Sequence, residues 1–331
     1  MKRRWLLYIA VLALLPILIG GGRYALFLRQ TIAPPAAITI SVPKGISFGA
    51  VAHKLRSAGI ISSVVCFKLL ARWRGNTAAI QAGDYYFAGP KTPGQILERL
   101  VTGDVERHRL TIPEGFSRKQ ISERLQQSDF RDAAAFLPLT SDAALICTLG
   151  IKSATLEGYL FPETYTFDSR TSSQQLIQAM VAQCLAELTP VLLAKAKEQG
   201  LNRHQLLTLA SIIQKEAGNN SEMPLISAVF HNRLRLGIAL QADPTVIYGI
   251  KDFDGNLTRR HLRKITPYNT YRVAGLPPGP IASPGRAALR AAANPAGVNY
   301  LYFVARGDGN HQFSKTLREH NAAVRRYQLK R

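Results

Sequence analysis

The sequence is poor in acidic residues and in cysteine. It has 21 aspartates and glutamates against 42 lysines and arginines, and only three cysteines in 331 residues. These are Cys66, Cys147 and Cys184, an odd number with neither C-x-x-C nor zinc-finger spacing. We expect them to pack as small apolar side chains. The sequence leaves open whether two of them form a disulfide.

Motifs for metals, cofactors and serine nucleophiles are missing. The sequence has no H-E-x-x-H, no cluster of Cys and His, no P-loop and no Rossmann glycine pattern. We therefore predict no metal and no cofactor. The nucleophile elbow G-x-S-x-G is also absent, so Ser211 and His231 are not expected to form a nucleophile–base pair.

The excess of basic residues predicts an anionic neighbour. The formal net charge is +21 and the pI is about 10.3. Nucleic acid, a membrane surface and an acidic polymer each fit such a balance. Apolar residues make up 47% of the chain, which is enough for packed cores.

The first residues predict a membrane anchor. A basic head over residues 1–4 precedes an uncharged, mostly apolar run from Trp5 to Gly22, and snorkelling of Arg23 can extend the run. We predict a transmembrane helix over residues 5–28 with its amino terminus in the cytoplasm. A cleaved signal peptide is the alternative, although no clear A-x-A site follows. The remaining chain then lies outside the cytoplasm, which argues against nucleic acid as the partner.

A strand–turn–helix pattern occurs twice after a Pro/Ala-rich linker, placed at residues 29–37. In the first copy Ile38, Ile40 and Val42 alternate as in a strand, and Ser47 can cap the helix. In the second copy Ser117 takes the same place, 70 residues further on. Such units are reminiscent of sugar-binding LysM modules. We predict a small LysM-like αβ subdomain over residues 38–118, with a packing unit that binds no ligand as the alternative.

Residues 119–331 predict a larger mixed α/β domain. This part is mainly helical to residue 235 and then irregular, with a helix at 285–293 and a strand at 300–305. The loop "LEGYLFPETYTF" carries Glu157 and Glu163 among aromatic rings. Rings stack on sugar faces and carboxylates accept hydrogen bonds from hydroxyls, so the loop suits carbohydrate. A satellite core is the alternative.

The stretch "LLTLASIIQKEAG", residues 206–218, predicts a helix capped by Asn202, with Gln205 near a capping box. Glu216 follows Leu209 by seven residues, so it continues an apolar face. Partial burial and the negative end of the helix dipole both raise the pKa of a carboxyl group there, so Glu216 is predicted to donate a proton. The alternative is a glutamate that reaches solvent or pairs with an arginine. Other acids that could act with it are Asp243, Glu222, Glu157 and Glu163.

Five segments carry a family resemblance: "LEGYLFPETYTF", "LASIIQKEAG", "AVFHNRLRLGIALQADPTVIYG", "PYNTYRVAGLPPGPIASPGRAAL" and "YLYFVARGDGNHQFSKTLREHN". In order and spacing they resemble the YceG-like family of endolytic murein transglycosylases, from the anchor to about residue 320. The resemblance implies a single-pass inner-membrane enzyme with a periplasmic catalytic domain. Such an enzyme cleaves nascent peptidoglycan between N-acetylmuramic acid and N-acetylglucosamine without water, which leaves 1,6-anhydro-muramoyl ends.

The resemblance also implies roles for residues. The family's catalytic glutamate corresponds to Glu216. The family often has Glu-Lys-Glu where this chain has Gln214-Lys215-Glu216, which argues that an acid at position 214 is not essential. One acid suffices, because the muramoyl C6 hydroxyl replaces water as the nucleophile. Candidates for positioning the sugar are Glu163, Gln241, Asp243, Asn269 and Tyr271, with Tyr159 and Tyr248 as stacking surfaces and Arg233 and Arg272 as carboxylate-binding bases.

The sequence therefore predicts an α+β protein with an N-terminal transmembrane helix, a LysM-like subdomain and a catalytic domain. Its expected partners are peptidoglycan, whose acidic muropeptides suit the basic charge, and inner-membrane lipid. By resemblance, cell-wall synthases are candidate partners, and nucleic acid is not expected. Two alternatives stay open: a hydrolytic muramidase that uses Glu216 with Asp243 or Glu163, and a non-catalytic peptidoglycan-binding scaffold.

Overall fold

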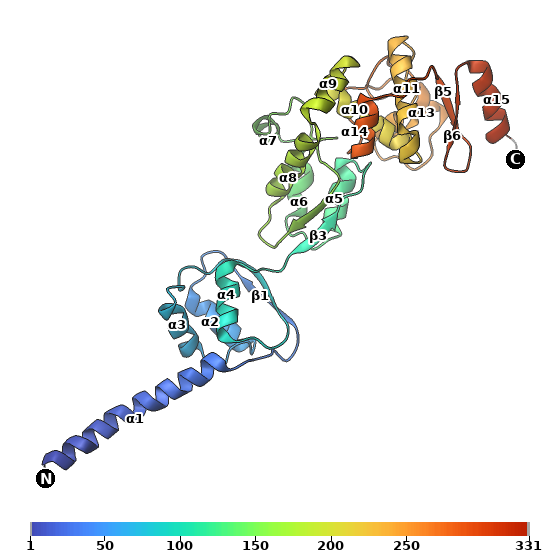
Figure 1. The fold of residues 1–331 in the computed structure, drawn as a ribbon. Helices are drawn as coiled ribbons and strands as arrows, with labels where there is room; N and C mark the ends of the chain where they lie inside the picture. The colour runs from blue at the N-terminus through green and yellow to red at the C-terminus, as the bar shows by residue number, and fades with distance from the viewer. Residues whose placement is uncertain (1, 330–331) are drawn as a thin grey trace. The chain divides into compact units, whose positions relative to one another are not determined.

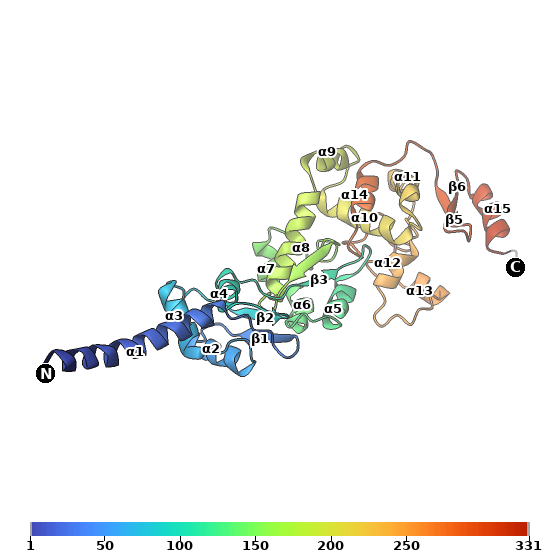
Figure 2. The same cartoon turned by 60° about the horizontal axis from the view of Figure 1, so that its bottom comes forward.

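The computed structural model describes residues 2–329, with side chains for residues 14–16 and 18–329. The chain divides into two compact units, Met1–His108 with Thr166–Arg170, and Arg109–Tyr165 with Thr171–Arg331. Figure 1 and Figure 2 show the elements of each unit. Helices and three two-stranded sheets make up the described part of the chain, which confirms the predicted α+β class.

The first unit is a small αβ unit built on an antiparallel pair of strands. Its elements are α1 Lys2–Arg29, β1 Ile38–Val42, α2 Phe48–Ser57, α3 Val64–Trp73, β2 Gly83–Phe87 and α4 Pro93–Thr102. β1 pairs with β2 along its whole length. Leu55, Phe67 and Leu97 from the three short helices meet in one apolar core. Ser47 caps α2 as predicted, since its hydroxyl accepts a hydrogen bond from the Ala50 amide.

The last turns of α1 belong to this core. Phe27 is only 4% exposed, and Tyr24 and Leu28 pack against the same cluster. The segment that follows, predicted as a linker, is tied to the unit where the backbones of Ile32 and Lys91 form a β-bridge. The end of the predicted anchor therefore contacts protein.

The predicted membrane anchor falls partly on side chains that are not described. Residues 5–13 and residue 17 of that segment lie outside the described side chains, so the anchor stays a prediction. Among the described residues no single helix is long and apolar enough to cross a membrane. One bent pair, Ser173–Glu187 with Pro190–Glu198, reaches that length and composition only when its two helices are taken together.

The second strand–turn–helix copy forms where the sequence predicts it. It consists of β3 His108–Thr111 and α5 Arg118–Gln126, and Ser117 caps α5 in a capping box with Gln120. β3 pairs with β4 Thr164–Phe167, whereas β1 of the first copy pairs with β2. The two copies thus share a local pattern but belong to different sheets. The predicted subdomain bounds, residues 38–118, stay a prediction. The LysM-like interpretation stays a prediction.

The second unit surrounds a central helix, α10. Besides α5, its elements are α6 Ala133–Leu139, α7 Ala143–Thr148, α8 Ser173–Glu187, α9 Pro190–Glu198, α10 Arg203–Glu216, a 3-10 turn Asn220–Glu222, α11 Met223–Arg235, α12 Asp243–Tyr248, α13 Arg259–Arg263, α14 Arg286–Ala293, β5 Tyr302–Ala305, β6 His311–Ser314 and α15 Leu317–Tyr327. α10 contacts α9, α11, α12 and α14, and α14 runs beside it in both views (Figure 1, Figure 2). β5 and β6 form an antiparallel hairpin against which α15 packs.

α10 is buried on all sides and not on one face alone. All eight residues from Leu206 to Ile213 are buried. The single apolar stripe expected from the sequence therefore understates the burial. The polar positions are tolerated because the Thr208 hydroxyl donates to the His204 carbonyl at 2.8 Å and the Ser211 hydroxyl donates to the Thr208 carbonyl at 2.7 Å. Glu216 is the last residue of this helix, where the chain leaves the core.

The region after residue 236 is more regular than its composition suggests. The predicted helix at 285–293 and strand at 300–305 correspond to α14 and β5. Three further helices and a strand, α12, α13, α15 and β6, interrupt segments that were expected to be irregular. Asp243 precedes a proline, a setting that also suits a turn, but it is the first residue of α12, and Pro244 follows it in the first helical turn.

Candidate active site

Glu216 lines a polar cavity of about 390 Å³, here called the Glu216 cavity. Its polar lining includes Glu216, Arg233, Gln241, Asp243, Tyr271, His311 and His320. The capping box of Asn202 and Gln205 fixes the start of α10, and eight buried residues hold the helix in place. Glu216 is partly buried, and its carboxylate has no hydrogen-bond or ion-pair partner among the described residues. A ligand can therefore reach a carboxyl group whose position is fixed by the core.

The environment of Glu216 favours its protonated form. Burial raises its pKa from the ordinary 4.5 to about 8, and the negative charge of Asp243 adds to this rise. The positive charge of Arg233 opposes it but does not cancel it. The direction is the one the sequence predicts. At neutral pH most molecules hold the proton, so the group can act first as an acid and, once it has lost the proton, as a base.

Three of the predicted sugar-positioning residues share this cavity with Glu216. The Tyr271 hydroxyl donates a hydrogen bond to Asp243 Oδ1 at 2.7 Å. Gln241 has a φ of 52°, an uncommon left-handed conformation for a residue other than glycine. The backbone N–H of Gln241 donates a hydrogen bond to the Thr270 carbonyl at 3.1 Å, which holds this conformation in place. Asp243, Tyr271 and Gln241 thus form one polar wall beside the acid.

Arg233 brings a buried positive charge to the same cavity. It is 8% exposed, and its guanidinium donates to the backbone carbonyls of Leu301 at 2.7 Å and of Leu240 at 2.7 Å. These bonds tie α11 to the start of the β5 hairpin and to the segment before α12. Arg233 therefore holds two walls of the cavity together besides acting on the charge of Glu216.

The two predicted stacking tyrosines lie elsewhere. Tyr159 is 2% exposed, and its hydroxyl meets His204 Nδ1 at 3.0 Å. The Tyr248 hydroxyl donates to Glu157 Oε2 at 3.1 Å, and Glu157 also accepts from the Arg118 amide at the start of α5. Burial raises the pKa of Glu157 to about 7. Tyr159 of the aromatic loop and Tyr248 of α12 are thus engaged within the protein, and neither lines the Glu216 cavity.

Asn269 and Glu163 are likewise engaged within the protein. Asn269 is fully buried, and its side-chain amide donates to the backbone carbonyls of His261, Leu262 and Lys264. Glu163 forms an ion pair with Arg286 at 3.2 Å. Neither residue lines the Glu216 cavity, and Arg272 does not line it either.

Ser211 and His231, which are not expected to form a catalytic pair, each bond to the protein backbone. Ser211 Oγ donates to the Thr208 carbonyl and accepts from the Ile281 amide. His231 Nε2 bonds the Ala292 carbonyl at 2.8 Å. Both side chains connect α10 and α11 to neighbouring segments. The three cysteines are free thiols: Cys184 is buried as expected, Cys66 is partly buried, and Cys147 is exposed, so the expected packing is wrong for Cys147. Within residues 2–329 no group of three His, Cys, Asp or Glu side chains is arranged to hold a metal ion.

The C-terminal hairpin supplies residues that the sequence did not single out. Phe303, Val304 and Ala305 of β5, His311 of β6 and His320 of α15 line the Glu216 cavity. The rings of His320 and Tyr302 stack with centroids 5.2 Å apart. These residues lie about a hundred positions after Glu216 in the chain. Their sequence signal was a segment rich in histidine and aromatic residues, and no local pattern assigns them to this site.

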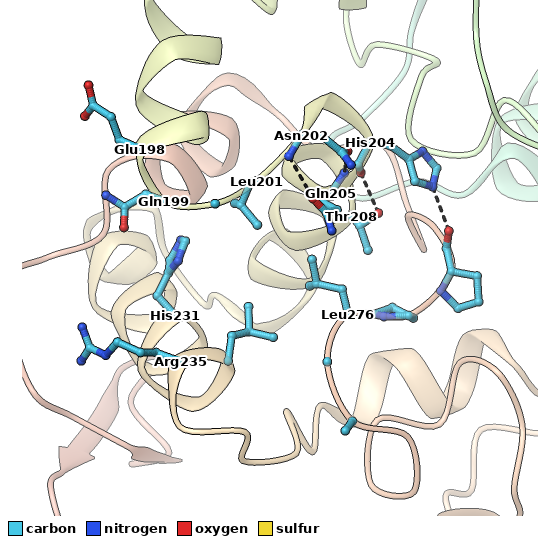
Figure 3. A pocket seen from close by; sticks show the side chains of 16 residues that line it. Glu198, Gln199, Leu201, Asn202, His204, Gln205, Thr208, His231, Arg235 and Leu276 are labelled. Atoms are coloured by element: carbon cyan, nitrogen blue, oxygen red, sulfur yellow. Dashed lines mark hydrogen bonds between the residues drawn. The ribbon is translucent and has the colours of Figure 1, made fainter.

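A larger cavity of about 970 Å³ lies at the other end of α10 (Figure 3). α10 has 14 residues, so its two ends are about 20 Å apart. The lining of the larger cavity includes His204, His231 and Arg235. The one carboxylate in this lining, Glu198, is exposed. Both ring nitrogens of His204 are already bonded, to Tyr159 and to the Pro278 carbonyl. The smaller Glu216 cavity is the better candidate active site, because only it combines a protonated carboxyl group with unengaged polar groups.

The fold and the cavity define a class: an α+β protein with a single protonated acid in an open polar site. A family model described as the YceG-like family matches residues 40–326, and the chain belongs to that family. This confirms the resemblance seen in the sequence.

Two similar proteins carry the name endolytic murein transglycosylase. The one from Bacillus subtilis (strain 168) is 32% identical over 335 residues, which is 94% of this chain and 91% of the relative. The one from Streptococcus pneumoniae (strain D39) is 28% identical over 354 residues, which is 96% of this chain and 64% of the relative. A crystal structure of a yceG-like protein from Listeria monocytogenes is also similar, with a TM-score of 0.60 and 32% identity over 86% of this chain and 98% of that one.

Proposed function

We propose that this protein is an endolytic lytic transglycosylase of peptidoglycan, and that Glu216 is its one catalytic acid and base. The observation that carries the proposal is the Glu216 carboxyl group, which lies unpaired in a polar cavity and whose pKa burial raises to about 8. Membership of the YceG-like family and the names of the two relatives support the same reaction and substrate.

The reaction needs one proton that leaves Glu216 and returns to it. Glu216 protonates the oxygen that links muramoyl C1 to the next sugar, and that C–O bond breaks as positive charge develops at C1. The resulting carboxylate takes the proton of the muramoyl C6 hydroxyl, whose oxygen forms a new bond to C1. The products are a 1,6-anhydro-muramoyl end and a free hydroxyl on the released N-acetylglucosamine. The attack is within one sugar, so no second carboxylate has to activate water.

The second candidate is a hydrolytic muramidase, and one observation favours it. Asp243 lies in the same cavity as Glu216 and could activate water. The version that uses Glu163 is weaker, because Glu163 is paired with Arg286 away from this cavity. Tyr271 already donates to Asp243, which suits a residue that orients a sugar hydroxyl.

Mass spectrometry of digested glycan separates the candidates. Anhydro ends support the transglycosylase, and reducing ends support the muramidase. Glu216→Gln should abolish cleavage while glycan still binds. A fully active Glu216→Gln variant would refute the mechanism. A wild-type protein that binds glycan but cleaves none would favour the scaffold alternative.

We further propose that the protein is anchored in the inner membrane through residues 5–28, with the catalytic unit in the periplasm. The apolar run and the basic head support this topology. The first unit is proposed to act as a LysM-like glycan-binding module, and cell-wall synthases are proposed neighbours. Labelling of Cys147, which is exposed, by a membrane-impermeant thiol reagent in intact spheroplasts tests the topology. Labelling only after the inner membrane is disrupted would contradict it.

A further inference from the structure

His311 differs from the other histidines that the structure describes in the second unit, because a buried carboxylate orients its ring beside the Glu216 cavity. His311 Nδ1 lies 2.8 Å from Glu222 Oε2, and the His311 amide donates to Glu222 Oε1 at 2.9 Å. The two side chains are only 12% and 11% exposed. The ring also packs edge-on against Phe303, with centroids 5.3 Å apart. One carboxylate therefore fixes both the backbone and the ring of this residue.

This contact decides which ring nitrogen carries the hydrogen. A carboxylate oxygen accepts hydrogen bonds, so Nδ1 holds the proton that it donates to Glu222. In the neutral form of such a ring the lone pair is on Nε2. Among the described residues Nε2 of His311 has no hydrogen-bond partner, and it is not one of the buried unpaired atoms. The ring thus offers an unused acceptor, and the residue lines the Glu216 cavity.

The segment just after Glu216 holds the hairpin that carries His311. The Asn219 side-chain amide donates to the Gly309 carbonyl at 3.3 Å and to Asn310 Oδ1 at 3.0 Å. A β-carbon at Gly218 would come within 2.5 Å of the Gly309 carbonyl oxygen, so only glycine allows this close approach. Glu222 itself ends the same segment. Residues 217–222 therefore fix the positions of Glu216 and His311 relative to each other.

We propose that His311 contacts the substrate: its Nε2 accepts a hydrogen bond from an O–H or N–H group of the sugar held in the Glu216 cavity, and Glu222 is the positioning residue that sets its tautomer. The proposal rests on the proposed function. His204, by contrast, bonds through both ring nitrogens within the protein.

Three variants test the acceptor. His311→Gln keeps an acceptor near the place of Nε2, whereas His311→Asn keeps one only near Nδ1. Glu222→Gln keeps an oxygen for the His311 amide but presents an NH₂ group to Nδ1, so the ring proton moves to Nε2 and the acceptor is lost. We expect kcat/KM to fall about tenfold in His311→Asn and in Glu222→Gln, and to stay within about threefold of the wild type in His311→Gln.

Product and binding measurements separate this contact from a structural effect. The share of reducing ends should rise in His311→Asn and Glu222→Gln, because a poorly held sugar lets water compete. In the inactive Glu216→Gln background, adding His311→Asn should weaken glycan binding about tenfold. His204→Asn serves as the matched control: it should lower the unfolding temperature without changing the product ratio.

The outcomes are distinguishable. Wild-type kinetics, products and binding in both His311→Asn and Glu222→Gln would overturn the proposal, as would an equal loss in His311→Gln and His311→Asn. If His311→Asn does not fold, Glu222→Gln, which is nearly isosteric with the native side chain, carries the same test. A wild-type protein that makes only reducing ends would count against the transglycosylase reaction, while the binding comparison would still decide the contact of His311.

Discussion

Replacing Glu216 with glutamine should stabilise the protein, and by more at higher pH. The pKa of Glu216 rises from 4.5 to about 8 on folding, so the folded state binds its proton more tightly than the unfolded state. Near pH 4 both states are protonated, and Glu216→Gln should have little effect. Between pH 4.5 and 8 the unfolded state ionises first, so the wild type loses stability as the pH rises. Above pH 8 the loss is complete.

The magnitude follows from the shift. A shift from 4.5 to about 8 corresponds, at about 1.36 kcal/mol per pKa unit, to roughly 3–5 kcal/mol. Glu216→Gln lacks this ionisation, so above pH 8 it should exceed the wild type by up to that amount. Glu157, whose pKa is about 7, titrates in both proteins and therefore cancels from the difference.

Calorimetric unfolding of both full-length proteins in the same detergent, from pH 4 to pH 9, measures this difference. Glu198→Gln is the control for loss of a surface carboxylate, because Glu198 is exposed. A difference between Glu216→Gln and the wild type that stays constant over this range would refute the reasoning. It would mean that the carboxyl group ionises as it does in the unfolded chain.

Three further outcomes are expected. Asp243→Asn removes a negative charge that raises the pKa of Glu216. The alkaline limb of the kcat/KM–pH profile should therefore move to lower pH, and a limb at unchanged pH would contradict this. Gln214→Ala loses a hydrogen bond to the amino end of α14, so it should lower the free energy of unfolding by about 1 kcal/mol and leave kcat/KM unchanged. Gln214→Glu keeps the acceptor and should keep the wild-type free energy of unfolding. Tyr248→Phe should lower the free energy of unfolding by about 1 kcal/mol at pH 8 and by less at pH 5, where Glu157 is protonated. An equal loss at both pH values would argue against the raised pKa of Glu157.

Local signals in the sequence predicted the elements well. A capping box joins residues only three positions apart, so the pairs Asn202–Gln205 and Ser117–Gln120 could be recognised without knowing the fold. The start of α12 shows the limit of such signals. The preset φ of Pro244 suits both a turn and the first turn of a helix, and the packing of α12 against α10 favoured the helix.

The candidate site was predictable only in part, because most of it depends on contacts between distant segments. Glu216 stood out as a charged residue at the end of an apolar helix. Asn269 and Tyr271 are two positions apart in one motif, yet the fold buries Asn269 against backbone carbonyls and directs Tyr271 to Asp243. No periodicity distinguishes the two. Glu222 and His311 are 89 positions apart, so their pairing could not be seen in the sequence.

The way α10 ends explains why one segment can organise the whole site. A catalytic acid must be held rigidly and yet remain open to its substrate, and these demands conflict for a side chain in the middle of a buried helix. Here the fully buried stretch ends at Ile213 and Glu216 is only partly buried, so its backbone is still held by the helix while its carboxylate faces the cavity. The six residues that follow reach the β5–β6 turn through Asn219 and Glu222. The acid and the opposite wall therefore depend on one short stretch of chain, and its close approach at Gly218 leaves little freedom for either to move alone.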